Sequence, residues 1–100
     1  MSISYCPGCY TDDLLEEYPF LNDVEIYTVD WYDLPPDVLA ATDCEKRIYV
    51  RRDLPWLLFN HSLYHEAEHI LKKRQNIDAS EFEVEMDARK KSGLNLDYIV

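Results

Sequence analysis

The sequence has no long apolar run, no Lys or Arg before position 46, and only two glycines and three cysteines. Without about 18 consecutive apolar residues, it contains no candidate membrane-spanning helix. The first five residues lack both the basic segment and the apolar segment of a secretory signal, so we expect a cytoplasmic protein. In that compartment, so few cysteines do not predict a disulfide framework.

Basic side chains are missing from residues 1–45, where eleven Asp or Glu residues occur, whereas residues 46–100 hold nine acidic and ten basic residues. The net charge is −10. Because an acidic surface repels phosphate groups, we expect no direct binding to nucleic acid. The charge serves solubility, attracts a basic partner, or mimics nucleic acid.

Apolar residues make up 47% of the 100 positions, which is enough for a core, and we expect residues 1–100 to form a single domain. Residues 24–31 are rich in β-branched and aromatic side chains and predict a strand. Residues 38–42 and 47–51 predict a hairpin. Residues 1–8 show no convincing strand pattern.

Capping residues predict the helices. Thr11 begins a short helix that Pro19 ends. A long helix follows Asp53, its expected N-cap, with Pro55 in the first turn, and it ends near Arg74 after two lysines.

A last helix begins at Ser80, which can form a capping box with Glu83, and it ends near Gly93. The apolar tail, residues 94–100, is expected to dock on the domain.

The long helix carries the H-E-x-x-H segment of residues 65–69. At about 100° per residue, His65 and His69 lie only about 40° apart, so their imidazoles can bind one ion. This spacing predicts a zinc site, in which Glu66 takes a proton from the metal-bound water. The opposite face is expected to pack in the core through Trp56, Phe59, Leu63, Ala67 and Ile70.

A third protein ligand must come from another element. His61 lies roughly 12 Å along the axis from His69, too far to join it at one ion, and we expect it to line the cleft or to contact the metal ligands without binding the ion itself. A turn at residues 75–79 would fold the last helix back against the long one. One of three acids could then reach the histidines: Glu83, Glu85 or Asp87. Glu85 is preferred, because the small Ala88 shares its face and allows the helices to approach closely.

Cys6-Pro7-Gly8-Cys9 has the C-x-x-C spacing of a zinc knuckle or a redox pair. A knuckle needs two more ligands, and Cys44 is the only other cysteine. A redox pair is expected to follow a strand, which the sequence does not predict here. We therefore interpret Cys6 and Cys9 as ordinary thiols at a helix start, with a second metal site or a redox role as alternatives.

Two stretches resemble the ImmA/IrrE family of zinc metallopeptidases, which belongs among the wider gluzincins. Residues 47–69, RIYVRRDLPWLLFNHSLYHEAEH, are similar to that family's strand and H-E-x-x-H helix. Residues 85–89, EMDAR, are similar to its E-x-x-A-N/D signature. Arg89 stands where Asn or Asp is usual, and Glu68 stands where Gly is frequent.

The resemblance implies that His65, His69 and Glu85 bind zinc and that Glu66 is the general base of a short, stand-alone metallopeptidase. It also implies an α+β fold with a minimal zincin-like core, in which a small antiparallel sheet packs on the H-E-x-x-H helix and on the glutamate-bearing helix that follows it. It also suggests a protein or peptide substrate, such as a regulatory protein of a phage or mobile element, and the acidic residues 1–45 favour a basic one. The alternatives are a catalytically inactive zinc-binding interaction module and an acidic phage-type inhibitor that mimics nucleic acid.

Overall fold

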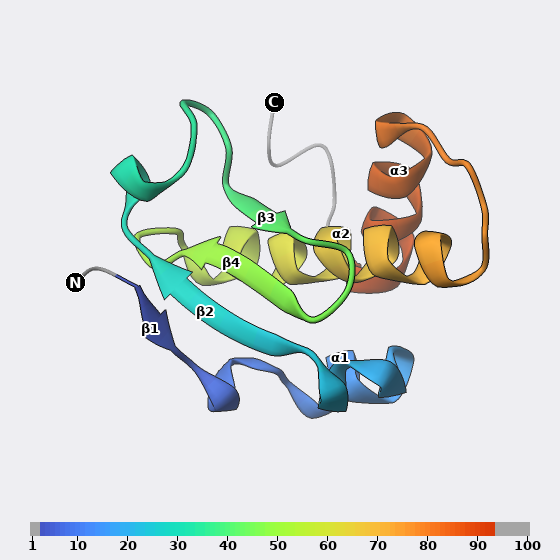
Figure 1. Ribbon diagram of the computed structural model, residues 1–100, viewed down its shortest axis with the longest axis horizontal. Coiled ribbons are helices and arrows are strands. Elements are labelled where there is room, and N and C mark those ends of the chain that lie inside the picture. Colours follow the sequence, from blue (N-terminus) through green and yellow to red (C-terminus); the bar gives the residue numbers. More distant parts are fainter. Residues whose placement is uncertain (1–2, 94–100) are drawn as a thin grey trace.

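The structure is a computed structural model and describes residues 3–93. Its architecture is α+β, as the sequence predicts: one face of a four-stranded sheet lies on α2, and α3 crosses α2 (Figure 1). The predicted docking of residues 94–100 lies outside the described residues. The elements follow in the order β1 (Ser4–Tyr5), η1 (Pro7–Cys9), α1 (Asp12–Glu17), η2 (Pro19–Asp23), β2 (Glu25–Val29), η3 (Trp31–Asp33), β3 (Ala40–Thr42), β4 (Arg47–Arg51), α2 (Trp56–Arg74) and α3 (Glu81–Ser92), where η marks a 3-10 helix.

The strands are arranged in the order β1-β2-β4-β3. The predicted hairpin is confirmed, because β3 and β4 pair antiparallel, and β1 also pairs antiparallel with β2. The expectation of a wholly antiparallel sheet is wrong, since β2 and β4 are parallel, with Ile26 opposite Ile48. The cause is topological, because β3 lies at the edge of the sheet and runs opposite to β2. The antiparallel hairpin then places β4 between β3 and β2, in the direction of β2.

The strand predictions differ from the structure in several places. β3 covers only Ala40–Thr42 of the expected residues 38–42, because the Val38 amide turns back to donate a hydrogen bond to the Pro35 carbonyl at 3.1 Å. The strand expected over residues 24–31 ends at Val29, because the side chain and backbone of Asp30 form a capping box with Asp33 that starts η3. The N-terminal segment, expected to lack a strand, contains β1, in which Tyr5 pairs with Tyr27. A strand of two residues is too short to leave a recognisable alternating pattern.

The predicted N-caps of the first and last helices are confirmed, although only one of the two hydrogen bonds of the capping box expected between Ser80 and Glu83 is formed. The Thr11 hydroxyl accepts a hydrogen bond from the Leu14 amide at 3.1 Å, and the Ser80 hydroxyl accepts one from Glu83 at 3.2 Å. Gly93 ends α3 with φ of 74°, a left-handed conformation that favours glycine. These local signals fix where α1 begins and where α3 begins and ends.

The N-cap of α2 is Pro55, and the expectation that Asp53 would cap it is wrong. The Asp53 carboxylate is taken up by the Arg51 guanidinium, which donates two hydrogen bonds to it at 2.9 and 2.7 Å. Such a bidentate pair outcompetes a single bond to a helix amide. The helix nevertheless ends at Arg74, as expected.

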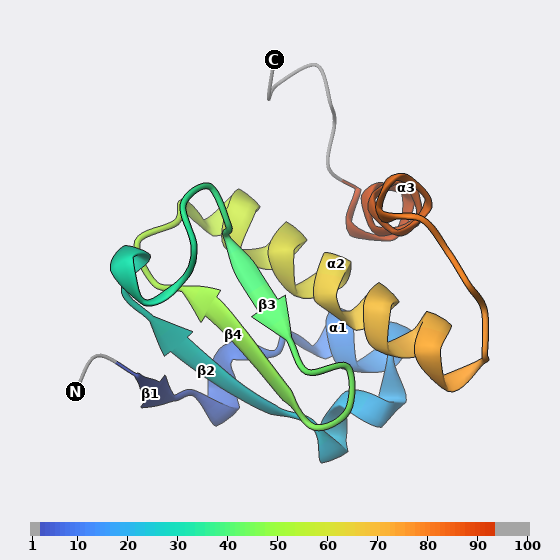
Figure 2. The ribbon, with the colours of Figure 1, turned by 45° about the horizontal axis from the view of Figure 1, so that its top comes forward.

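The core lies between the sheet and the two helices α1 and α2, which cover the same face of it (Figure 2). Leu63, Ala67 and Ile70 of α2 are fully buried, as predicted, and Phe59 packs against the core. Trp56 is 59% exposed, contrary to the prediction, because it is the first residue of α2 and lies at the surface, where one of its faces stacks on Phe59. No helix within residues 3–93 is both long and apolar enough to span a membrane.

Candidate metal centre

The crossing of α3 over α2 brings histidines and carboxylates together (Figure 2). Three histidines spaced four residues apart, His61, His65 and His69, form a stripe along one face of α2. Glu81 and Glu85, also four residues apart, face that stripe from α3. We call these five side chains the His–Glu cluster. They form two groups that could hold a metal ion, and His65 belongs to both.

The first group consists of His65, His69 and Glu81. Glu81 Oε1 lies 2.7 Å from His65 Nε2 and 3.1 Å from His69 Nε2, and the two nitrogens are 3.2 Å apart. An ion bound tetrahedrally at about 2.0–2.1 Å keeps neighbouring ligand atoms about 3.3 Å apart. The triangle is thus slightly smaller than a metal-bound one, so that small side-chain shifts would admit an ion.

The second group consists of His61, His65 and Glu85. Glu85 Oε1 lies 2.8 Å from both His61 Nε2 and His65 Nδ1, while Arg89 Nε donates a hydrogen bond to Oε2 at 3.0 Å. The Glu85 carboxylate therefore already contacts three side chains. A carboxylate that accepts a hydrogen bond from one ring nitrogen of a histidine directs the other nitrogen toward a metal. By this geometry, Glu85 turns His65 Nε2 toward Glu81.

The structure brings two of the three predicted zinc ligands into one group. His65 and His69 share a group as expected, but Glu85 lies against the opposite ring nitrogen of His65, and Glu81 takes the third position. The sequence reasoning did not consider Glu81. Its signal was present, because Glu81 precedes Glu85 by one helical turn and so lies on the same face, roughly 6 Å along α3.

The other two predicted candidates lie away from the histidines. Asp87 binds Lys72, whose Nζ is 2.7 Å from Oδ2. Glu83 is exposed, and among residues 3–93 it belongs to neither metal-binding group. Ala88 is fully buried, which agrees with its expected role in the close approach of the helices.

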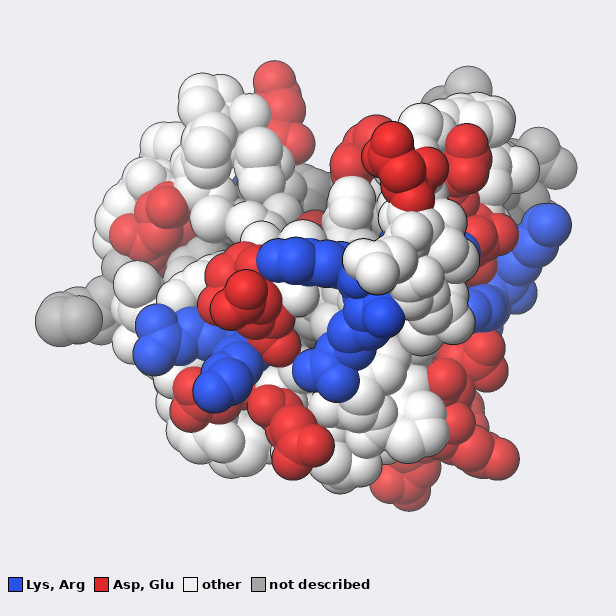
Figure 3. Space-filling view, turned by 45° about the vertical axis from the view of Figure 1, so that its right-hand side comes forward, with Lys and Arg blue, Asp and Glu red and all other residues white. Residues whose placement is uncertain are grey.

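Glu66 faces a cavity of about 320 Å³ beside these groups. Its side chain is buried, with only 6% of the residue exposed. Burial raises the pKa of Glu66, although His65 and His69 oppose the rise. The cavity is bounded on one side by α2 and α3 and on the other by residues 37–40, and His61 lines it as predicted. Figure 3 shows the surface hollowed beside α3, with acidic side chains on the rim.

The electrostatics of the His–Glu cluster favour a positive charge. Burial lowers the pKa of His65, but its hydrogen bonds to Glu85 and Glu81 outweigh burial and raise that pKa. Burial likewise raises the pKa of Glu81 and of Glu85, but the imidazoles that donate hydrogen bonds to them bring both values below the usual range. A proton held by His65 and a metal ion would therefore compete for the same ring nitrogen.

The cysteines do not contribute to this centre. Cys6 and Cys9 form a disulfide, so their interpretation as ordinary thiols is wrong, and Cys44 is a free thiol. The reason is that β1 and η1 fold the segment into a tight turn with 5.5 Å between the two Cα atoms, within the range of a disulfide. In the described part of the chain, no metal-binding group includes a cysteine.

Comparisons with models of protein families, with curated proteins and with solved structures give no match to this chain. The resemblance of residues 47–69 and 85–89 to the ImmA/IrrE family therefore stays a prediction from the sequence. In the structure these two stretches meet where His65 Nδ1 lies 2.8 Å from Glu85 Oε1.

Proposed function

We propose that this protein is a zinc-dependent metallopeptidase, in which His65, His69 and Glu81 bind the metal and Glu66 is the general base. The observation that carries the proposal is the convergence of the three ligand atoms, 2.7 to 3.2 Å from one another, beside a cavity that Glu66 also lines. Two imidazoles and one carboxylate suit zinc and leave a coordination position for water. Zinc bound there would lower the pKa of that water to about 7 and polarise a substrate carbonyl.

Glu66 is suited to move the proton. It is on the same helix as both histidines, one residue after His65, and its carboxylate lies in the cavity wall. A carboxylate oxygen there takes a proton from the water as the water attacks the carbonyl carbon, and it then returns the proton to the leaving amine. Because burial raises its pKa, Glu66 binds a proton more readily than an exposed glutamate does.

The edge of the sheet beside the cavity supports an extended peptide as the substrate. β3 is an edge strand, and it pairs on one side with β4. Val38 and Leu39, which lead into β3, and Ala40, its first residue, line the same cavity as His65. A peptide that adds to such an edge is held by main-chain hydrogen bonds, with little dependence on its sequence.

Acidic residues around the cavity favour a basic substrate. Asp37 and Glu81 line it, and Glu81 has 73% of its side chain exposed. Together with the eleven acids of residues 1–45, they would attract Lys or Arg side chains. We propose a basic peptide or protein as the substrate, such as a regulator of a phage or mobile element, and we expect the enzyme to act in the cytoplasm.

Incubation with a library of Lys- and Arg-rich peptides, analysed by mass spectrometry, tests this proposal. We expect cleavage by the zinc-loaded protein, loss of cleavage after a chelator removes the metal, and recovery on addition of zinc. Glu81→Gln should lose cleavage, whereas the matched control Glu83→Gln, on an exposed position of the same helix, should keep it. Zinc binding without cleavage of any peptide would favour the inactive interaction module, and failure to bind zinc would refute both functions.

A further inference from the structure

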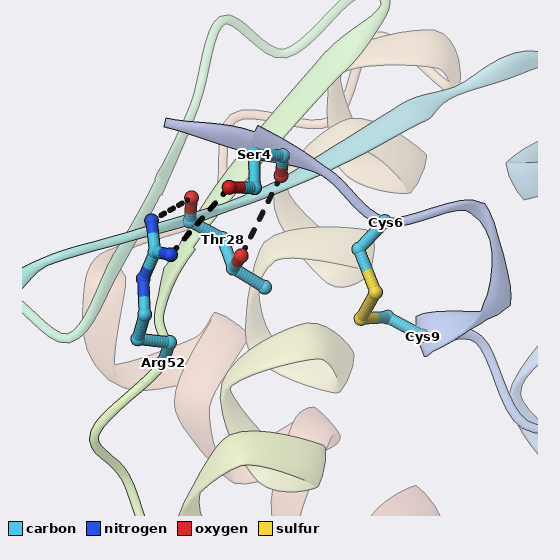
Figure 4. The surroundings of a disulfide bond; sticks show 5 residues. All are labelled: Ser4, Cys6, Cys9, Thr28 and Arg52. Carbon is cyan, nitrogen blue, oxygen red and sulfur yellow. Dashed lines mark hydrogen bonds between the residues drawn. A yellow bond between two sulfur atoms is a disulfide. The ribbon is translucent and has the colours of Figure 1, made fainter. Parts of the chain in front are cut away.

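The disulfide between Cys6 and Cys9 lies apart from the His–Glu cluster, in the turn that follows β1 (Figure 4). Only Pro7 and Gly8 separate the two cysteines, and both of these residues are exposed. Cys6 and Cys9 themselves are half-buried. The ring is thus a small one at the protein surface, and the proposed peptidase does not use it.

Backbone contacts hold this turn in place without help from the sulfur atoms. The Cys6 amide donates a hydrogen bond to the Ile26 carbonyl at 2.8 Å, which extends the β1–β2 ladder, and the Cys9 amide donates one to the Cys6 carbonyl at 3.2 Å. Pro7 presets the backbone at the start of η1. A cross-link over so short a loop also removes less chain entropy than a long-range disulfide does.

The strand before the turn is anchored separately. Figure 4 shows Arg52 reaching across to both β1 and β2. Its Nη2 donates a hydrogen bond to the Thr28 carbonyl at 2.9 Å, and its Nη1 lies 3.5 Å from the Ser4 hydroxyl. Opening the disulfide would therefore leave Cys6 fixed to β2, with Cys9 close to it.

A reagent can reach the pair from the surface. Cys9 borders a groove of about 440 Å³ between η1 and the first turn of α2, and Gly8, Trp56 and Phe59 are among the residues that line it. Trp56 is 59% exposed there. The groove gives a second molecule room next to Cys9. A disulfide enclosed in the core would have no such room beside it.

We propose that Cys6 and Cys9 form a dithiol–disulfide exchange site that a partner dithiol can reduce while the domain stays folded. A disulfide that contributes little to the fold, lies at the surface and keeps its two cysteines together has the features of a reversible one. This activity is independent of the proposed peptidase, because no cysteine belongs to a metal-binding group within residues 3–93.

The exchange balances as two successive sulfur substitutions. A thiolate of the partner dithiol attacks one sulfur of the disulfide, the Cys6–Cys9 bond breaks, and the second cysteine leaves as a thiolate that takes up a proton. The partner's other thiol then loses its proton and attacks the partner sulfur of the mixed disulfide, which releases the first cysteine as a thiolate that is protonated in turn. The partner is oxidised to its disulfide, and Cys6 and Cys9 gain two electrons and two protons.

Titration with dithiothreitol tests the proposal on the full chain carrying Cys44→Ser, which removes the third thiol. Samples at increasing ratios of reduced to oxidised dithiothreitol are alkylated without denaturant and weighed by mass spectrometry. We expect two labels to appear together at one midpoint and to disappear on reoxidation, while the reduced protein keeps a cooperative thermal transition. A pair that is labelled only after denaturation, or a protein that unfolds on reduction, would show a structural disulfide and overturn the proposal.

Glutathione disulfide provides the second measurement. In Cys9→Ser with Cys44→Ser, Cys6 should form a mixed disulfide that persists. In reduced Cys44→Ser protein, the neighbouring Cys9 should resolve the same adduct more than about tenfold faster, because it is held in place for an intramolecular attack. Equal lifetimes in the two proteins would overturn the proposal, since they would mean that the cysteines do not act as a pair.

Discussion

Two clusters of polar side chains lie between α2 and α3, and they differ in how their acids are neutralised. In the first, which we call the Glu68 cluster, Glu68 and Asp87 face Lys72 and Lys91, and Tyr18 completes it. Glu68 is fully buried and accepts hydrogen bonds from Tyr18 and, at 2.7 Å, from Lys91 Nζ, while Lys72 Nζ lies 3.2 Å from its other oxygen. Burial alone would raise the pKa of Glu68, but these three partners hold it below its usual range.

In the His–Glu cluster, two carboxylates face three imidazoles and a single guanidinium. Arg89 contacts Glu85. The contacts that the structure gives for the Glu81 carboxylate are with the rings of His65 and His69. The cluster is also more open, since 73% of the Glu81 side chain is exposed.

The difference separates a structural role from a binding role along one helix interface. The Glu68 cluster brings its own ammonium groups and needs no further cation. The His–Glu cluster has no ammonium group of its own and instead gathers ring nitrogens and carboxylate oxygens, which can exchange a proton for a metal ion. The Glu68 carboxylate links α2 to Tyr18, the residue that follows α1, and to Lys91 of α3.

The largest effect is expected from Glu66→Gln, which changes the chemistry of the metal centre and leaves both clusters in place. Gln has nearly the same shape but cannot take up a proton at neutral pH, so peptide cleavage should fall about 10²–10⁴-fold. Zinc content and the melting temperature should remain those of the wild type. Cleavage at the wild-type rate would exclude Glu66 as the base.

The next effect concerns zinc affinity and separates Glu81 from Glu85. Glu81→Ala removes a ligand and should weaken zinc binding by more than about 100-fold, whereas Glu85→Gln removes only the group that orients His65 and should cost about 10–100-fold. Competition with a chromogenic chelator measures both, with Glu83→Ala as the unaffected control. If Glu85→Gln has the larger effect and Glu81→Ala leaves affinity unchanged, Glu85 is the ligand, as the resemblance implies.

Breaking the Glu68 cluster should affect stability and not metal binding. Glu68→Ala leaves Lys72 and Lys91 without their shared acid and should lower the free energy of unfolding by about 3 kcal/mol. Urea denaturation measures the loss, and elemental analysis of the folded variant should still find wild-type zinc. A folded variant that has lost its metal would show that the two clusters do not have separate roles.

The smallest effect is expected away from both clusters. Cys6→Ser/Cys9→Ser removes a cross-link over a very short loop and should cost at most about 2 kcal/mol of stability. Its zinc stoichiometry should equal that of the wild type. Loss of one zinc equivalent in this variant would reveal a metal site at the cysteines.

Local signals account for the parts of the fold that the sequence predicts. The Thr11 and Ser80 caps, the β3–β4 hairpin and the end of α2 each depend on residues close in the chain, and the structure confirms them. The pairing of His65 with His69 is of the same kind, because four-residue spacing on a helix is enough to bring two rings together.

The features that the sequence does not reveal depend on contacts between distant segments. The parallel pairing of β2 with β4 follows from the position of β3 at the sheet edge. Glu81 and Glu85 lie on one face of α3, and only the crossing of α3 over α2 determines which of them meets His69. The disulfide likewise depends on β1, whose two residues are recognised only through their pairing with β2.

The proposed function depends on a metal ion at His65, His69 and Glu81, and a crystal of the zinc-loaded protein measured on both sides of the zinc absorption edge tests it most directly. We predict one anomalous peak per chain, about 2.0–2.2 Å from His65 Nε2, His69 Nε2 and a Glu81 carboxylate oxygen. The absence of a peak at saturating zinc, or a peak away from both histidines, would contradict the account.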